Sequence, residues 1–166
     1  SLLQFCRPHG VRVQGLHFIA HVMATDATML MIAAHEVLHP PFDMNGAVAR
    51  EALAVLAQDP LLKRVLAEKP RETGYNDLAG LFEEGVVQAL DQIVQQRLGH
   101  GRDPGERWRD ADGGLHLLAA AFHGLLTADA FDRDGGCIEE WLGNAVRSGL
   151  LLPARWQAAA ADVLGR

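Results

Sequence analysis

Apolar positions recur with helical spacing over most of the chain and with two-residue alternation only near its N-terminus. In residues 78–98, apolar side chains keep the three- and four-residue spacing of a helix face, and Gly99 follows as a stop signal. Residues 11–14 and 16–22 are the best strand candidates, because apolar and polar side chains partly alternate on both sides of Gly15. The pattern predicts a mainly α chain (α+β) with a small N-terminal β hairpin or edge strand.

Further helices are predicted where the same spacing is bounded by capping residues. The segment 26–39 begins at a capping Thr25 or Asp26 and ends before Pro40, because a residue that precedes proline disfavours helical geometry. The polar, glycine-bearing stretch 100–112 is typical of a loop and is the best internal hinge candidate, although it is too short to link two domains. Other helices are expected at 47–57, 61–68, 115–126, 137–146 and 153–164.

The composition is that of one soluble globular domain, which we expect to span residues 1–166. The formal net charge is −6 and long basic runs are missing, which argues against a nucleic-acid-binding surface. No apolar run reaches the roughly 18–20 residues that a membrane span needs.

The chain starts at Ser1 without an initiator Met. If a signal peptide had been removed before Ser1, the protein would be secreted or periplasmic. Cys6 and Cys137 allow one disulfide or two thiols.

The most specific pattern is His35-Glu36-Val37-Leu38-His39, the HExxH arrangement of zinc-dependent hydrolases. On a helix, His35 and His39 lie one turn apart on one face, so both imidazoles can bind one metal ion. Zn²⁺ accepts neutral imidazoles, keeps a position open for water and lowers the pKa of that water, whose proton Glu36 would take. The competing interpretation is a solvated helix face with one hydrogen-bonded core histidine.

Two histidines seldom complete a zinc site, so a third ligand is needed. The motif does not continue as HExxHxxGxxH, because Phe42 and Asn45 occupy the positions of the glycine and the third histidine. Glu83 and Glu84 lie in the apolar helix predicted at 78–98, where a buried carboxylate is costly unless a positive group pairs with it. We expect Glu84 to be the third ligand, with Glu83 as the alternative. For either residue, the competing interpretation is that its carboxylate faces solvent and binds no metal.

With HExxH on one helix and a glutamate on a later one, the chain resembles the gluzincins, a group of zinc metallopeptidases. It is more particularly similar to uncharacterised bacterial metallopeptidases in which HExxH is followed directly by Pro and a later helix reads Glu-x-x-Val-x-Ala-Leu, here residues 84–90. The resemblance covers residues 10–98. It implies a zincin-like helical domain that uses Zn²⁺ to hydrolyse peptide or protein substrates. It also implies that His35, His39 and Glu84 are the ligands.

The resemblance further implies that Glu36 is the general base and that a donor stabilises the developing oxyanion. Tyr75, the only tyrosine, is our candidate for this donor, with His116 and His123 as alternatives. For these three residues, ordinary packing or surface placement is the competing interpretation. The rival function is a non-catalytic helical interaction domain with a structural metal or none. The sequence does not indicate the oligomeric state.

Overall fold

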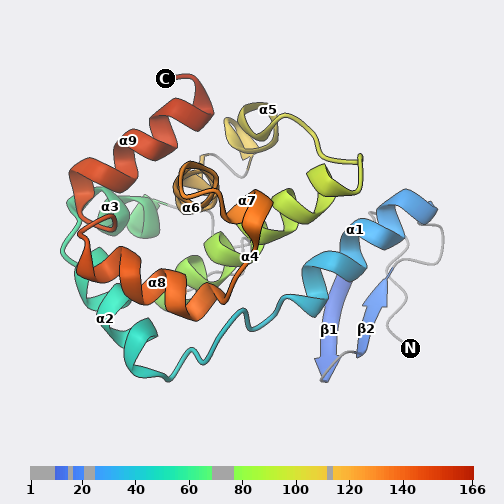
Figure 1. Cartoon of the computed structure of the whole chain (residues 1–166), viewed down its shortest axis with the longest axis horizontal. Coiled ribbons are helices and arrows are strands. Elements are labelled where there is room, and N and C mark those ends of the chain that lie inside the picture. The colour runs from blue at the N-terminus through green and yellow to red at the C-terminus, as the bar shows by residue number, and fades with distance from the viewer. Residues whose placement is uncertain (1–9, 15–16, 21–24, 69–76, 112–113) are drawn as a thin grey trace.

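The computed structural model describes residues 10–14, 17–20, 25–68, 77–111 and 114–166. This part of the chain is mainly helical, which confirms the mainly α prediction. Strands β1 (Gly10–Gln14) and β2 (His17–Ala20) pair antiparallel, with a register shift between Arg12 and Gln14. Both strands contact α1 (Asp26–Val37), and Figure 1 shows the three elements together at one end of the molecule.

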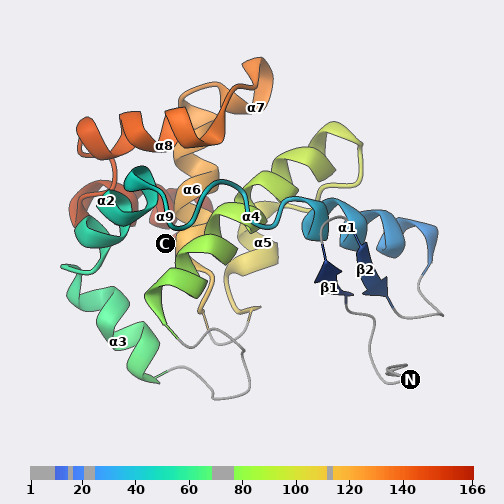
Figure 2. The same ribbon diagram turned by 90° about the horizontal axis from the view of Figure 1, so that it is seen from below.

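The other described helices form the larger part of the structure around the longest of them, α4 (Leu78–Arg97). Helix α4 packs against both α1 and α6 (Leu117–Ala128), and α6 packs in turn against α9 (Pro153–Leu164) (Figures 1 and 2). Within the described residues, no helix combines the length and the apolar character that crossing a membrane requires. After α1, the helices are α2 (Ala47–Leu56), α3 (Pro60–Glu68), α4 (Leu78–Arg97), α5 (Pro104–Trp108), α6 (Leu117–Ala128), α7 (Phe131–Asp134), α8 (Ile138–Arg147) and α9 (Pro153–Leu164).

Helix α4 is fixed at its start and along its buried face. The Asp77 side chain accepts a hydrogen bond from the Gly80 backbone N–H at 2.9 Å, which satisfies one of the free donors of the first turn. Gly85 allows α4 to approach α6 closely, because a Cβ atom at this position would lie 2.9 Å from the Cβ of Leu118. The backbone immediately after Glu84 is therefore held against α6.

The segment that joins α1 to α2 is anchored on α4 by aromatic rings. Phe42 is buried, and its ring centroid lies 5.7 Å from that of Phe82, which in turn lies 5.7 Å from that of Phe122. Because Phe82 directly precedes Glu83 and Glu84, this contact brings the end of α1 next to both acids. Tertiary packing therefore decides where the second histidine of the motif lies.

Three details differ from the sequence prediction, one of them being the short helix α7 (Phe131–Asp134), where no helix was predicted. The stretch 100–112 is not simply a loop, because it contains α5, whose N-cap Asp103 accepts a hydrogen bond from the Glu106 backbone N–H at 2.9 Å. Polar residues outnumber apolar ones there, so hydrophobic spacing gave no helix signal, although Trp108 is fully buried. Helix α1 ends at Val37 and not near 39, because its last turn tightens and the Leu38 N–H bonds to the His35 carbonyl.

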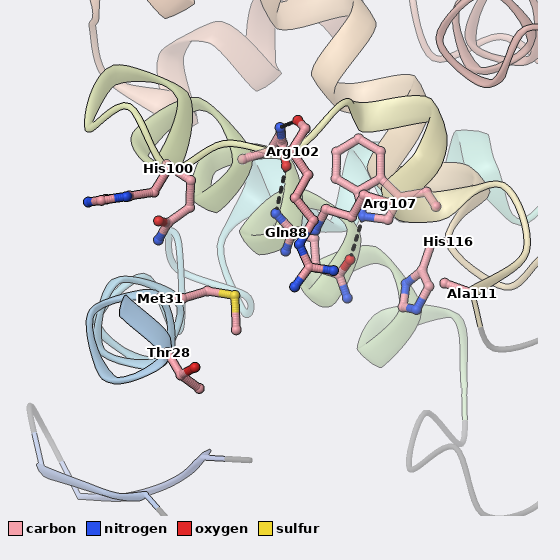
Figure 3. A pocket seen from close by; sticks show the side chains of 11 residues that line it. Thr28, Met31, Gln88, His100, Arg102, Arg107, Ala111 and His116 are labelled. Carbon is pink, nitrogen blue, oxygen red and sulfur yellow. Dashed lines mark hydrogen bonds between the residues drawn. The ribbon is translucent and has the colours of Figure 1, made fainter. Parts of the chain in front are cut away.

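A cavity of about 470 Å³ lies between α1, α4 and the α5 region (Figure 3). Most of the residues that line it have polar side chains, and the described lining contains Thr28, Met31, Gln88, Gln92, Gln95, His100, Arg102, Arg107, Trp108, Ala111 and His116. Of the two cysteines, Cys137 is exposed with a free thiol, and Cys6 lies outside the described residues.

Candidate metal centre

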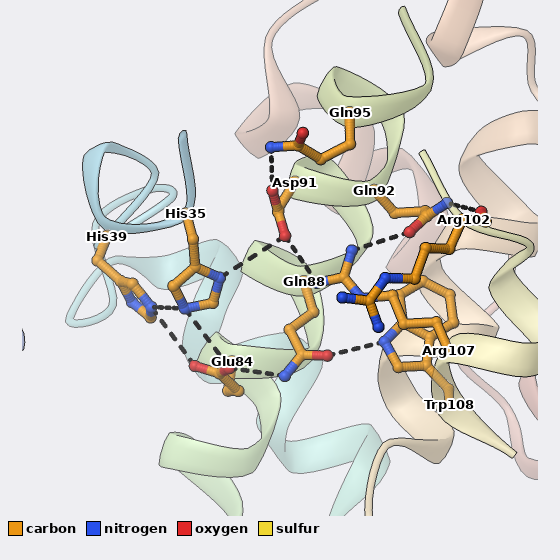
Figure 4. Close-up of polar contacts among 10 residues, drawn as sticks. All are labelled: His35, His39, Glu84, Gln88, Asp91, Gln92, Gln95, Arg102, Arg107 and Trp108. Carbon is orange, nitrogen blue, oxygen red and sulfur yellow. Dashed lines mark hydrogen bonds and ion pairs between the residues drawn. The ribbon is translucent and has the colours of Figure 1, made fainter. Parts of the chain in front are cut away.

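His35, His39 and Glu84 come together where the end of α1 meets α4 (Figure 4). His39 Nε2 lies 3.3 Å from His35 Nε2 and 3.4 Å from Glu84 Oε2, and His35 Nε2 lies 3.6 Å from Glu84 Oε1. In a tetrahedral zinc site with bonds of about 2.0–2.2 Å, two ligand atoms are about 3.3–3.6 Å apart. The separation of the two Nε2 atoms fits two ligands of one tetrahedral ion, and Glu84 has one carboxylate oxygen at a similar distance from each of them.

Each imidazole also has a carboxylate near its other nitrogen. His39 Nδ1 lies 3.0 Å from Glu83 Oε1, which is a hydrogen-bond distance. His35 Nδ1 lies 3.9 Å from Asp91 Oδ2, which is within ion-pair range. A carboxylate at Nδ1 favours the tautomer with the proton on that nitrogen and leaves Nε2 free to bind a metal. Both rings are thus arranged to present Nε2 to the same point.

The two adjacent acids of α4 have different positions in this cluster. Glu84 is buried, with 8% of its surface exposed, and lies within reach of both Nε2 atoms. Gln88 Nε2 donates a hydrogen bond to Glu84 Oε1 at 2.8 Å, one helix turn further along. Glu83 is more exposed, and among the described residues it contacts the outer nitrogen of His39. The geometry therefore fits Glu84 as a ligand and Glu83 as the residue that orients the His39 ring.

Without a metal, these groups form a charged network. Burial by itself lowers the pKa of His39, but the hydrogen bonds and charges of Glu84 and Glu83 outweigh burial and raise it. Burial by itself raises the pKa of Glu84, but the hydrogen bond from His39, the charge of His35 and the Gln88 amide bring it down to about 2. Glu84 is thus ionised at neutral pH, and a metal ion has to compete with a proton for His39.

A polar stripe on α4 continues from Glu84 through Gln88 and Asp91 to Gln95, at the four- and three-residue spacing of one helix face. Asp91 is only 1% exposed, and its carboxylate accepts hydrogen bonds from Arg107 Nη2 at 2.7 Å and Gln95 Nε2 at 3.2 Å. The supporting roles of Asp91, Gln95 and Arg107 were not predicted from the sequence. The spacing of polar residues on a buried helix was the signal for Asp91, whereas Arg107 depends on a tertiary contact with α5.

The other predicted site residues lie in different places. Glu36 is half-buried on α1, and its carboxylate makes no hydrogen bond or ion pair with the described residues. Tyr75 lies outside the described residues. His116 lines the cavity of Figure 3. His123 lies apart from the cluster, because its ring packs edge-on against Trp108 with centroids 5.7 Å apart.

Comparisons with protein-family models, curated proteins and solved structures give no match for this chain. Within the described residues, His35, His39 and Glu84 are the group of potential metal ligands whose atoms all lie within 4.8 Å of one another. Interpretation of the site therefore depends on its residues and their geometry.

The pKa shifts predict opposite effects of pH on the metal-free and zinc-loaded protein. Ionised Glu84 stabilises the metal-free fold above its ordinary pKa of 4.5, and this contribution is lost as the pH falls toward 2. Protonated His39 stabilises the metal-free fold fully below its ordinary pKa of 6.5, and this contribution is lost as the pH rises through the raised pKa of His39. The cluster should therefore stabilise the metal-free protein most between about pH 4.5 and 6.5.

Zinc requires neutral imidazoles, so its stabilising effect should increase with pH over the range where His39 loses its proton. Thermal denaturation at about pH 5.5 and about pH 8, with EDTA or with excess zinc, measures this difference. We expect the zinc-dependent rise in Tm to be larger at the higher pH. An equal rise at both pH values would contradict binding through His39.

Proposed function

We propose that this protein is a zinc-dependent metallopeptidase in which His35, His39 and Glu84 hold the metal ion. The observation that carries the proposal is the approach of three potential ligand atoms to within 4.8 Å, from α1, the turn that follows it, and α4, which is distant in the sequence. Two imidazoles and one carboxylate are typical of a catalytic zinc site, whereas structural sites usually have four protein ligands that include cysteine. The ligand set thus favours catalysis over a structural role.

Zinc, when bound in such a site, supplies a Lewis acid that polarises a carbonyl and lowers the pKa of water. Glu36 follows His35 on α1, about 100° further around the helix, so it borders the face that carries the imidazole. Its role is to take a proton from the attacking water and transfer it to the leaving amine. Because no described residue pairs with its carboxylate, Glu36 is free for this role.

Other residues of the cluster orient the ligands. Glu83 fixes the ring of His39, and Asp91 faces Nδ1 of His35. Gln88 donates to Glu84, and its own carbonyl accepts a hydrogen bond from Trp108 Nε1 at 2.8 Å. We assign the site to the gluzincin type and the helical domain to a zincin-like fold because the glutamate ligand comes from a helix later in the chain.

Cleavage of a peptide library by the zinc-loaded protein tests this function. We expect hydrolysis at defined peptide bonds, with the products identified by mass spectrometry. Activity should be lost when a chelator removes the metal and should return when zinc is added. Stoichiometric zinc binding without hydrolysis of any peptide would contradict the enzymatic proposal. That result would favour a zinc-containing helical domain without catalytic activity.

A further inference from the structure

Side chains that line the cavity of Figure 3 also contact residues of the metal cluster, as Figure 4 shows for Gln88. Gln88 lines the cavity and donates a hydrogen bond to Glu84. Arg107 also lines it and shares the carboxylate of Asp91 with His35. Its volume of about 470 Å³ is in the range of small-molecule and peptide side-chain sites. A group bound there would lie next to the metal site.

The described lining of the cavity is positively charged although the whole chain has a net charge of −6. It contains two guanidinium groups, from Arg102 and Arg107, and no carboxylate. Asp91 lies behind Arg107 and balances one of these charges. The other charge, that of Arg102, is exposed and has no hydrogen bond or ion pair with the described residues. Among the described residues, one positive charge of the cavity lining therefore has no carboxylate partner.

The two arginines are held by residues of α4. Arg107 donates from Nη1 to Gln92 Oε1 at 2.8 Å and from Nη2 to Asp91 Oδ2 at 2.7 Å, and its guanidinium lies 5.3 Å from the centre of the Trp108 ring. The Arg102 carbonyl accepts a hydrogen bond from Gln92 Nε2 at 2.6 Å. Gln92 thus fixes both the side chain of Arg107 and the backbone of Arg102, which reduces the entropy lost when a ligand binds.

We propose that this cavity binds a carboxylate group of the substrate, with Arg102 as the main binding residue and Arg107 as a second donor. Guanidinium groups bind carboxylates with paired hydrogen bonds, and a partly enclosed site strengthens such contacts. The part of this inference that concerns substrate rests on the proposed peptidase function. The carboxylate is either the C-terminus of a peptide or the side chain of an aspartate or glutamate close to the cleaved bond.

Binding is tested first, without reference to hydrolysis. N-acetylglutamate and N-acetylglutaminamide, which has no carboxylate, are titrated into the full chain, metal-free and zinc-loaded, and the indole N–H signal of Trp108 is followed by NMR. We expect N-acetylglutamate to bind, and Arg102→Gln to weaken it about tenfold or more, with partial recovery in Arg102→Lys. Arg155→Gln on α9 is the matched control, because Arg155 is also exposed but does not line the cavity. Equal binding of the two ligands, or no effect of Arg102→Gln, would overturn the inference.

Selectivity in hydrolysis is tested next with three peptides of one sequence. One has glutamate beside the cleaved bond, one has glutamine there, and one has glutamine and an amidated C-terminus. A lower kcat/KM for the glutamine peptide than for the glutamate peptide identifies an acidic side chain as the bound group. A lower kcat/KM for the amidated peptide than for the glutamine peptide with a free C-terminus identifies the C-terminus. Equal hydrolysis of all three would contradict the inference and leave the peptidase function intact. Selective binding of N-acetylglutamate without hydrolysis of any peptide would support the cavity and contradict the peptidase function.

Discussion

Glu36→Gln is expected to bind zinc with unchanged stoichiometry and to hydrolyse peptides about 10²–10⁴-fold more slowly than the native protein. The amide has nearly the same size as the carboxylate but cannot accept a proton from water at neutral pH. His35, His39 and Glu84 stay in place in this variant, so the substitution separates catalysis from metal binding. The measurement is kcat for a cleaved peptide, with zinc content determined on the same samples.

The matched control for this experiment is Glu51→Gln. Glu51 is an exposed acid on α2, so the same chemical change at this position should leave both zinc content and kcat unchanged. A rate in Glu36→Gln close to that of the native protein would remove Glu36 from the mechanism. Loss of zinc from the variant would show that Glu36 acts on the metal site and not on water.

Glu84→Gln should weaken zinc binding far more than Glu83→Gln. Glu84 lies 3.4 and 3.6 Å from the Nε2 atoms of the two histidines, and its replacement removes a negatively charged ligand. Glu83 contacts only Nδ1 of His39, and loss of such an orienting carboxylate typically reduces metal affinity about 10–100-fold. Competition with a chromophoric chelator measures both affinities. Comparable losses, or a larger loss in Glu83→Gln, would contradict the assignment of the two acids.

A folding control is needed because Glu84 is buried and Glu83 is not. Thermal denaturation in EDTA separates a damaged fold from a damaged metal site. The amide of Glu84→Gln keeps the size of the side chain and can still bond to Gln88. We therefore expect the metal-free variant to fold, with a lower Tm because the ionic contacts with His35 and His39 are lost.

The helices around the site follow from local patterns. The spacing of apolar residues and the stop signal at Gly99 predict the helix that the structure shows as Leu78–Arg97. The preference for Glu84 over Glu83 agrees with the distances in the structure. Local sequence was sufficient for this helix because its buried face and its end depend on residues within the helix and next to it.

Other parts of the site depend on contacts between distant residues. Helix α1 ends before His39, so the position of this ring is set by the packing of Phe42 on Phe82 and not by helical periodicity. Asp91 can be recognised as a supporting residue only together with its partner Arg107, which lies in a stretch that we predicted to be a loop. Neither hydrophobic spacing nor motif matching contains information about such pairs.

Anomalous diffraction from crystals of the zinc-loaded protein, measured on both sides of the zinc absorption edge, tests the central claim most directly. The claim is that one zinc ion lies between α1 and α4. We expect one anomalous peak about 2.0–2.2 Å from His35 Nε2, His39 Nε2 and a carboxylate oxygen of Glu84. Zinc density only at other residues, or none between these three side chains, would contradict it.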